Sequence, residues 1–241
     1  MSFVLETFDV DEVRACGIEL RALPQGGQRL ADDAQVICDY FYRSFVDEDG
    51  SPACALVRLY KTERFFDLDP ELQDFARSIS DVEPTDELRC LTLLGTAGTE
   101  PAWNDRSLSA GHRAIPLPSE ELVERLPMVA QLIRQLGIDI GVVVAPPTGH
   151  EARVLSQTFH EVFHVPVAAG SPYLPTQDFV AEHGIESAVG FGGIMLSGDF
   201  FALVLFSRVP ISDPVARTIK ILSQSIRVRF LPYNRVGGMR V

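Results

Sequence analysis

Apolar residues recur every three or four positions in three stretches of the chain, which is the spacing of one face of an α-helix. The three stripes are Leu30, Ala34, Ile37, Phe41 and Phe45; Leu122, Leu126, Val129, Ile133 and Leu136; and Val215, Ile219, Leu222 and Ile226. Ser119 is a suitable N-cap for the second helix, and Pro127 is expected to split or kink it. We also predict shorter helices that begin near Pro70 and cover residues 150–164.

Short apolar runs bounded by turn residues predict the strands. They cover residues 53–60 and 88–97, an edge strand in "RAIPL" at 113–117, and "IGVVVAP" at 140–146. The strongest local pattern lies at residues 187–208, where two apolar runs flank Ser197-Gly198-Asp199, a turn composition typical of a β-hairpin. Strands that follow one another, with helices at both ends of the chain, predict an antiparallel sheet with helices packed on it, an α+β fold.

No polar linker divides these segments, so we expect one main domain. Residues 1–27 end in the Pro/Gly sequence around "LPQGGQ" and are interpreted as an N-terminal extension. Residues 28–232 form the predicted domain, with an irregular Pro/Gly-rich passage at 165–184, and residues 233–241 form a C-terminal tail.

Charge and composition exclude several classes of function. The formal charge of −12 opposes binding to nucleic acids and to anionic membranes, which both need basic patches. The acidic start does not resemble a signal peptide, and the apolar run at 200–207 is far shorter than the roughly 20 residues that cross a bilayer. We therefore expect a cytoplasmic protein. Its four cysteines form no CxxC pattern, which favours buried free thiols over zinc or disulfide sites.

Four longer strings resemble GAF-like sensory domains, and in particular the N-terminal input region ahead of some bacterial histidine kinases. They are "ALVRLYKT", "LTLLGTAGTEPAWNDRSLSAGHRAIPLPS", "FHVPVAAGSPYLPTQDFV" and "GIESAVGFGGIMLSGDFFALVLFSRVPI". The resemblance implies a six-stranded antiparallel sheet, helices on one side that mediate dimerisation, and a pocket on the other side roofed by loops. It also implies that the domain binds a small molecule or relays the state of a partner. No string matches bilin attachment or cyclic-nucleotide binding, so the cofactor stays unknown.

A polar loop at residues 101–118 supplies most of the candidate ligand-binding side chains. Trp103 offers a stacking face, Arg106 and Arg113 offer positive charge, and His112 donates or accepts a hydrogen bond. Phe191 joins this set because its strand is rich in glycine, which marks a close approach of a ligand or of neighbouring backbone. The alternative is structural: residues 104–106 satisfy backbone groups while the tryptophan seals the core.

The string "HEVFH" formally matches the HExxH pattern of zinc hydrolases. On a helix, His160 and His164 would share a face and hold one metal or a haem iron, with Glu161 as the general base. A third ligand would come from Asp178, Glu182 or His183.

Three functions follow from these patterns. The leading hypothesis is a non-enzymatic sensor in the cytoplasm that binds a small molecule, dimerises through its terminal helices and signals to a separate effector protein. The dimer is inferred from the apolar stripe from Val215 to Ile226, which exceeds what one sheet face requires. The alternatives are a zinc-dependent hydrolase and an adaptor that acts by protein contact alone.

Overall fold

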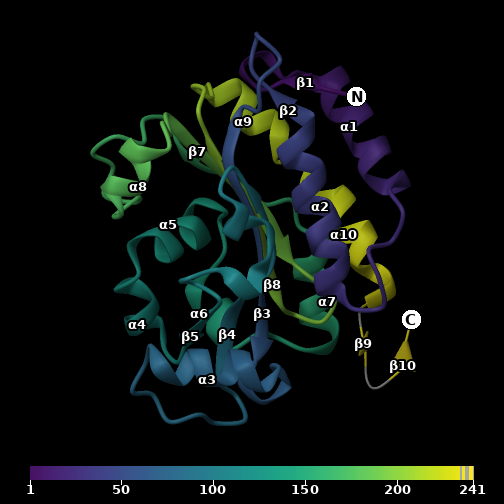
Figure 1. Cartoon of the computed structure of the whole chain (residues 1–241). Coiled ribbons are helices and arrows are strands. Elements are labelled where there is room, and N and C mark those ends of the chain that lie inside the picture. The colour runs from purple at the N-terminus through teal and green to yellow at the C-terminus, as the bar shows by residue number, and fades with distance from the viewer. Residues whose placement is uncertain (234, 237–238, 241) are drawn as a thin grey trace.

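The computed structural model describes residues 1–233, 235–236 and 239–240 (Figure 1). Its helices are α1 Val10–Ala22, α2 Leu30–Ser44, α3 Pro70–Ser78, α4 Glu120–Glu124, α5 Pro127–Gln135, α6 Ile140–Val144, α7 Gly149–Gln157, α8 Gln177–Glu182, α9 Asp213–Ile219 and α10 Leu222–Phe230. Its strands are β1 Phe3–Val4, β2 Phe45–Val46, β3 Cys54–Arg64, β4 Arg89–Gly98, β5 Ala114–Leu117, β6 Phe163–Val165, β7 Ser187–Ile194, β8 Phe200–Ser207, β9 Arg235–Val236 and β10 Met239–Arg240. Among the described residues, no helix has the length and apolar character needed to span a bilayer.

The centre of the molecule is a six-stranded sheet in the order β5-β4-β3-β8-β7-β6. Every neighbouring pair in this sheet is antiparallel. The predicted α+β architecture is therefore confirmed, as is the hairpin, whose strands β7 and β8 pair from Ser187 opposite Ser207 to Ile194 opposite Phe200. Strand β5 lies at one edge of the sheet. Pro116 is tolerated there because an edge strand does not need every backbone N–H for pairing.

One face of the sheet is covered by α1, α2, α9 and α10. Helices α1, α2 and α10 lie on the right of Figure 1. Side chains alternate between the two faces along each strand, so every second residue of β7 and β8 points into this layer. Phe201, Leu203 and Leu205 pack there against Phe41 of α2 and Phe230 of α10. This layer contains the larger part of the buried aromatic side chains and forms the main core.

The opposite face carries a second core beneath α4, α5, α6 and α8. Its floor is built from the other residues of β8, Phe200, Ala202, Val204 and Phe206. As predicted, Ser119 caps the first of these helices, since its Oγ accepts a hydrogen bond from the Leu122 amide, and the helical stretch divides before Pro127. Each of these helices has at most 9 residues, so this cover is built from shorter elements than α1 and α2 behind the sheet.

Two segments differ from the prediction. Residues 140–144 form helix α6 instead of a strand, because a short apolar run does not by itself distinguish a strand from a buried helix, and Asp139 caps the helix through the Gly141 amide at 2.7 Å. The helix predicted over 150–164 ends at Gln157, and Phe163–Val165 form β6, which pairs with β7. The passage at 165–184, predicted to be irregular, contains α8.

The N-terminal segment packs into the main core, and the C-terminal segment forms a separate pair of strands. Leu5, Phe8 and Leu20, from the segment interpreted as an extension, are buried in the same core as α2 and α10. Strands β9 and β10 of the predicted tail pair with each other, and residues 234, 237–238 and 241 of that tail lie outside the described residues.

The apolar stripe on which the predicted helix dimer was based is used inside one chain. Val215, Ile219, Leu222 and Ile226 are at most 6% exposed, and they pack in the main core from the two helices α9 and α10. This premise is therefore wrong: the terminal helices need this stripe to cover their own sheet, and α1 packs beside them.

A buried ion pair joins three of the four helices of this layer, α1, α2 and α10. The Arg229 Nε donates to Asp33 Oδ2 at 3.0 Å and a second nitrogen pairs with Oδ1, while the two side chains are 5% and 1% exposed. The same guanidinium donates to the carbonyl oxygens of Leu20, Leu23 and Pro24 at 3.1, 2.7 and 3.0 Å. Arg229 of α10 thereby holds α2 and satisfies the C-terminal carbonyls of α1.

Replacing Asp33→Asn should lower the free energy of unfolding by about 3–5 kcal/mol, because it leaves the buried guanidinium without a counter-charge. Glu121→Gln is the control, since it breaks the exposed Glu121–Arg125 pair and should change stability by at most about 1 kcal/mol. Urea unfolding measures both. Equal values for the two variants would show that the buried pair has no special role.

Candidate functional site

A cavity of about 330 Å³ lies between the sheet and its cover of short helices. Its floor comes from alternate residues of β3, Leu56, Arg58 and Tyr60, with Val204 and Phe206 of the neighbouring strand β8. Period-two alternation places these side chains on the same face, away from the helix layer. The cavity therefore exists because the second core does not completely fill the space above the centre of the sheet.

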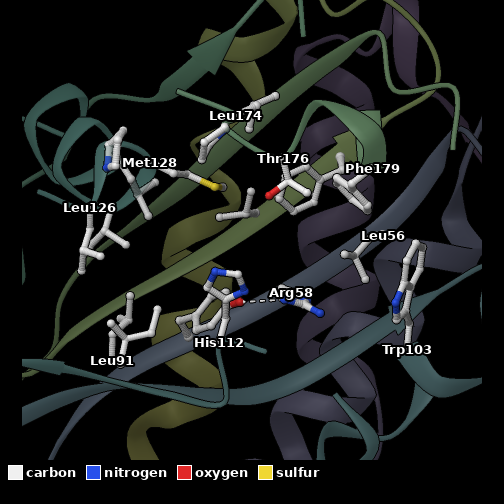
Figure 2. Close-up of a pocket in the computed structure, with 18 residues that line it drawn as sticks. Leu56, Arg58, Leu91, Trp103, His112, Leu126, Met128, Leu174, Thr176 and Phe179 are labelled. Atoms are coloured by element: carbon white, nitrogen blue, oxygen red, sulfur yellow. Dashed lines mark hydrogen bonds between the residues drawn. The ribbon is translucent and has the colours of Figure 1, made fainter. Parts of the chain in front are cut away.

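The roof of the cavity is apolar. It is formed by the start of α5 with the residue before it, and by the segment that leads into α8; the residues are Leu126, Pro127, Met128, Val129, Leu132, Leu174, Pro175, Thr176 and Phe179. Figure 2 shows Leu126, Met128, Leu174 and Phe179 on the side opposite Arg58. Floor and roof together offer an organic molecule two largely hydrophobic walls.

Arg58 is the charged group of the floor. Its Nη1 donates to Tyr60 Oη at 3.2 Å and its Nη2 donates to Ser109 Oγ at 3.2 Å. The Nε is buried and has no hydrogen-bond partner in the described part of the chain. Neither Asp nor Glu is among the described residues that line the cavity, so its one full charge is positive.

His112 lies beside Arg58 where the polar loop passes the cavity (Figure 2). Burial, followed by the positive charge of Arg58, lowers the pKa of His112 from its usual value of 6.5. The imidazole is therefore neutral at pH 7 and has one donor and one acceptor nitrogen for a ligand. Its backbone has φ of +60°, and this left-handed conformation follows Gly111 in the loop.

Trp103 lines the cavity and also closes one of its ends, on the right of Figure 2. Its ring packs edge-on against Phe179 at 5.7 Å and against His183 at 4.5 Å between ring centroids. Gly98 permits this position, because a Cβ there would lie 2.8 Å from Trp103 Cε3. The tryptophan thus joins the loop to the roof.

The rest of the loop has the structural role that the sequence left as the alternative. Asn104 Oδ1 accepts from the Gly98 amide, and its Nδ2 donates to the carbonyls of Gly98 and Glu100, each at 3.0 Å. Asp105 accepts from the Ser107 amide at 2.8 Å. These bonds fix the loop across the end of β4, and the same loop carries two cavity residues.

Three residues predicted to bind a ligand do not line the cavity. Arg113 pairs with Glu71 of α3 at 2.5 Å, and Arg106 lies 3.9 Å from Asp69 just before that helix, so acidic groups hold both arginines outside. Phe191 points to the other face of the sheet, where its ring lies 5.9 Å from that of Phe41. Phe191 therefore does not line this cavity, because its position in β7 places its side chain on the opposite face of the sheet.

His160 and His164 are not on one helix, so the geometry assumed for a shared metal is wrong. His164 lies in β6, where its Nδ1 is 3.0 Å from Asp213 Oδ1 and its Nε2 is 2.8 Å from the Ile211 carbonyl oxygen. Both ring nitrogens therefore face acceptors. Glu161, the supposed base, pairs with Lys220 at 2.7 Å.

His160 lies in a different environment. Its Cδ2 approaches Gly193, and its Nε2 is buried without a hydrogen-bond partner among the described residues. Burial, followed by the positive charge of Arg227, lowers its pKa to about 4. No group of three or more His, Cys, Asp or Glu side chains that could hold a metal occurs in the part of the chain that the structure describes.

The most informative cavity residue was missed from the sequence. Arg58 stands in "ACALVRLY", a strand that is otherwise almost entirely apolar, and an arginine there has no counter-charge on the same strand within two positions. An arginine without a nearby acidic residue in an apolar strand indicates a functional role for its charge. The roof residues gave no such signal, because Leu, Met and Phe at these positions are equally typical of a closed core.

No protein-family model matches the chain, and no curated protein matches its sequence. The solved structures that are similar in shape include the following two. The chromophore-binding domain of the bacteriophytochrome RpBphP3 from R. palustris is 10% identical with a TM-score of 0.39, over 90% of this chain and 59% of that one. The phycoerythrobilin-bound GAF domain of a cyanobacterial phytochrome is 12% identical with a TM-score of 0.39, over 95% of each chain.

The present chain thus spans 59% of the length of the bacteriophytochrome domain. At these TM-scores neither structure assigns a ligand or an activity to this chain, and the architecture is established by the strand order itself.

The environment of His160 predicts a pH dependence of stability. An unfolded chain binds a proton at this histidine near pH 6.5, whereas the folded chain does so only near pH 4, so stability is retained above pH 6.5 and declines as the pH falls through this window. Replacing His160→Gln should reduce the decline in urea midpoint between pH 7 and pH 5. His150→Gln, at an exposed histidine, is the control. The same decline in wild type and His160→Gln would contradict the buried, neutral state of His160.

Proposed function

We propose that this chain is a signal-input domain that holds a small organic molecule in the cavity and passes on whether the cavity is occupied. The observation that carries the proposal is the cavity itself, whose volume of about 330 Å³ is in the range of ligand sites and whose lining is largely apolar. The GAF-like resemblance of the sequence favours the same class of function.

The composition of the cavity walls favours binding over catalysis. Its hydroxyl groups are those of Tyr60 and Thr176, its imidazole is that of His112, and its lining in the described structure includes no Cys, Ser, Asp, Glu or Lys. A nucleophile with an adjacent base, or a pair of carboxylates, is the usual minimum for hydrolytic chemistry. We therefore propose a non-enzymatic role.

The roof is the element best placed to report occupancy. It consists of short segments, and Trp103 and Phe179 connect it to the loop at the end of β4. A ligand that fills the cavity adds apolar contacts to both walls and stabilises the arrangement of the roof in which these contacts are made. We propose that a separate signalling effector reads this arrangement, and that the protein acts in the cytoplasm, where its four free, buried thiols stay reduced.

We further propose that the chain forms a homodimer through α1 and α10. Since the stripe of α9 and α10 is buried, the contact between the two copies would use exposed apolar side chains on the outer surface of the helix layer that α1, α2, α9 and α10 form. Val10, Ile18, Ile221 and Val228 are 65%, 52%, 43% and 50% exposed there. Val10 and Ile221 also border the shallow groove between the two helices.

The replacement Val129→Trp should weaken the binding of 1-aminoanthracene, a neutral fluorescent probe, by at least about tenfold, because the larger side chain occupies the cavity. Val154→Trp is the matched control, since it makes the same exchange at a half-exposed position of α7, outside the cavity and outside the proposed dimer contact. Fluorescence titration gives the dissociation constants. Absence of saturable binding to wild type, or equal weakening in both variants, would refute the proposed site.

A further inference from the structure

The electrostatics of the cavity narrow the chemical class of its ligand. A guanidinium keeps its charge at all physiological pH values, so Arg58 brings a permanent positive charge to an otherwise apolar space. Charged groups that are removed from water are stable only when they are paired or hydrogen-bonded to strong acceptors. The partners of Arg58 therefore decide whether this charge is already compensated.

Three of the other largely covered arginines in the described structure have a carboxylate partner. Arg89 lies 3.0 Å from Asp199, Arg113 lies 2.5 Å from Glu71, and Arg229 pairs with Asp33. Each of these groups is a structural cation that the fold itself neutralises.

A second group of arginines is compensated by backbone carbonyl oxygens. Arg208 donates to the carbonyls of His183 and Cys54, and Arg227 donates to those of Ser156 and Thr158.

Arg58 belongs to neither group. Its two hydrogen bonds go to the neutral hydroxyl groups of Tyr60 and Ser109, and among the described residues no carboxylate lies within ion-pair distance of it. A guanidinium has five N–H donors, so three remain after these two bonds, one of them on the unpartnered Nε. The hydroxyl groups fix the orientation of the side chain and leave its charge uncompensated.

The neighbouring histidine does not supply the missing negative charge. Burial and the nearby charge of Arg58 lower the pKa of His112, so its imidazole is neutral at pH 7. It has one nitrogen that can donate a hydrogen bond to an anion held by the guanidinium. Figure 2 shows His112 and Arg58 side by side, with the apolar roof residues across the cavity from them.

We propose that the ligand is an amphipathic organic carboxylate, whose carboxylate pairs with Arg58 and whose apolar body lies between the floor and the roof of the cavity. This inference rests on the proposed function, because it assumes that the cavity takes a ligand. A carboxylate matches the planar fork of a guanidinium and accepts its free donors. The apolar body replaces water against Val204, Met128 and Phe179.

The test compares two probes with the same apolar chain, decanoate and decan-1-ol, in displacement of 1-aminoanthracene at pH 7.5. A charge-assisted hydrogen bond favours decanoate over the alcohol, and we expect its dissociation constant to be at least about tenfold lower. This comparison uses the wild-type protein alone, so it does not depend on the folding of any variant.

Two variants then assign the preference to a residue. Arg58→Gln should remove the advantage of decanoate and leave the affinity for decan-1-ol within about twofold, because only the ionic partner is lost. Arg106→Gln is the control, since this arginine lies in the loop that carries Trp103 and His112 but outside the cavity, and this variant should keep the advantage. Circular dichroism verifies that each variant is folded.

The outcomes separate the two proposals. If 1-aminoanthracene binds but decanoate and decan-1-ol compete equally well, the carboxylate proposal is wrong while the ligand-binding function stands. If the advantage of decanoate survives in Arg58→Gln, the assignment to this residue is wrong. If none of the three probes binds to the wild-type protein, the proposed function itself fails.

Discussion

The alternation of side chains along β7, along β8 and along β3 from Leu56 onward is the constraint on which the rest of the structure depends. It commits Phe191, Phe201 and Leu203 to the face covered by the long helices, and Arg58, Val204 and Phe206 to the other face. A slip of one residue in register would place the guanidinium in the main core. The sheet therefore fixes, before any loop is considered, which side can hold a ligand.

The two faces are finished in different ways. Behind the sheet, two long helices and the terminal pair α9 and α10 fill the space with aromatic and aliphatic side chains, and the Asp33–Arg229 pair joins α10, α2 and the end of α1. In front, short helices are connected by turns and leave a cavity over Arg58. The whole chain carries a charge of −12, so at long range it repels anions, and the positive charge in the cavity acts only at contact distance. Apolar contacts with the walls would therefore hold the body of an anionic ligand, and the charge of Arg58 would hold its anionic group once that group is inside the cavity.

Patterns that extend over many residues predicted their elements correctly. The stripe of α2 and the hairpin of β7 and β8 repeat a signal over several turns or strand positions, and the single residue Pro127 marks the break between α4 and α5. The segments 140–144 and 158–164 are too short for periodicity to distinguish a helix from a strand. The cap at Asp139 makes the first a helix, and pairing with β7 makes part of the second a strand. The structure brings Trp103 and His112 to the cavity, whereas Arg106 and Arg113 lie outside it, because their acidic partners at residues 69 and 71 approach only in the folded chain.

The central claim is that a ligand enters the cavity in front of the sheet. It is tested most directly by nuclear magnetic resonance of protein with labelled Leu, Val and Ile methyl groups, in the presence of decanoate. The account predicts nuclear Overhauser contacts from the ligand chain to methyl groups of Leu56, Leu126 and Val204, which line the cavity. Contacts confined to Val13, Ile221 and Leu222, in the groove between α1 and α10, would contradict it.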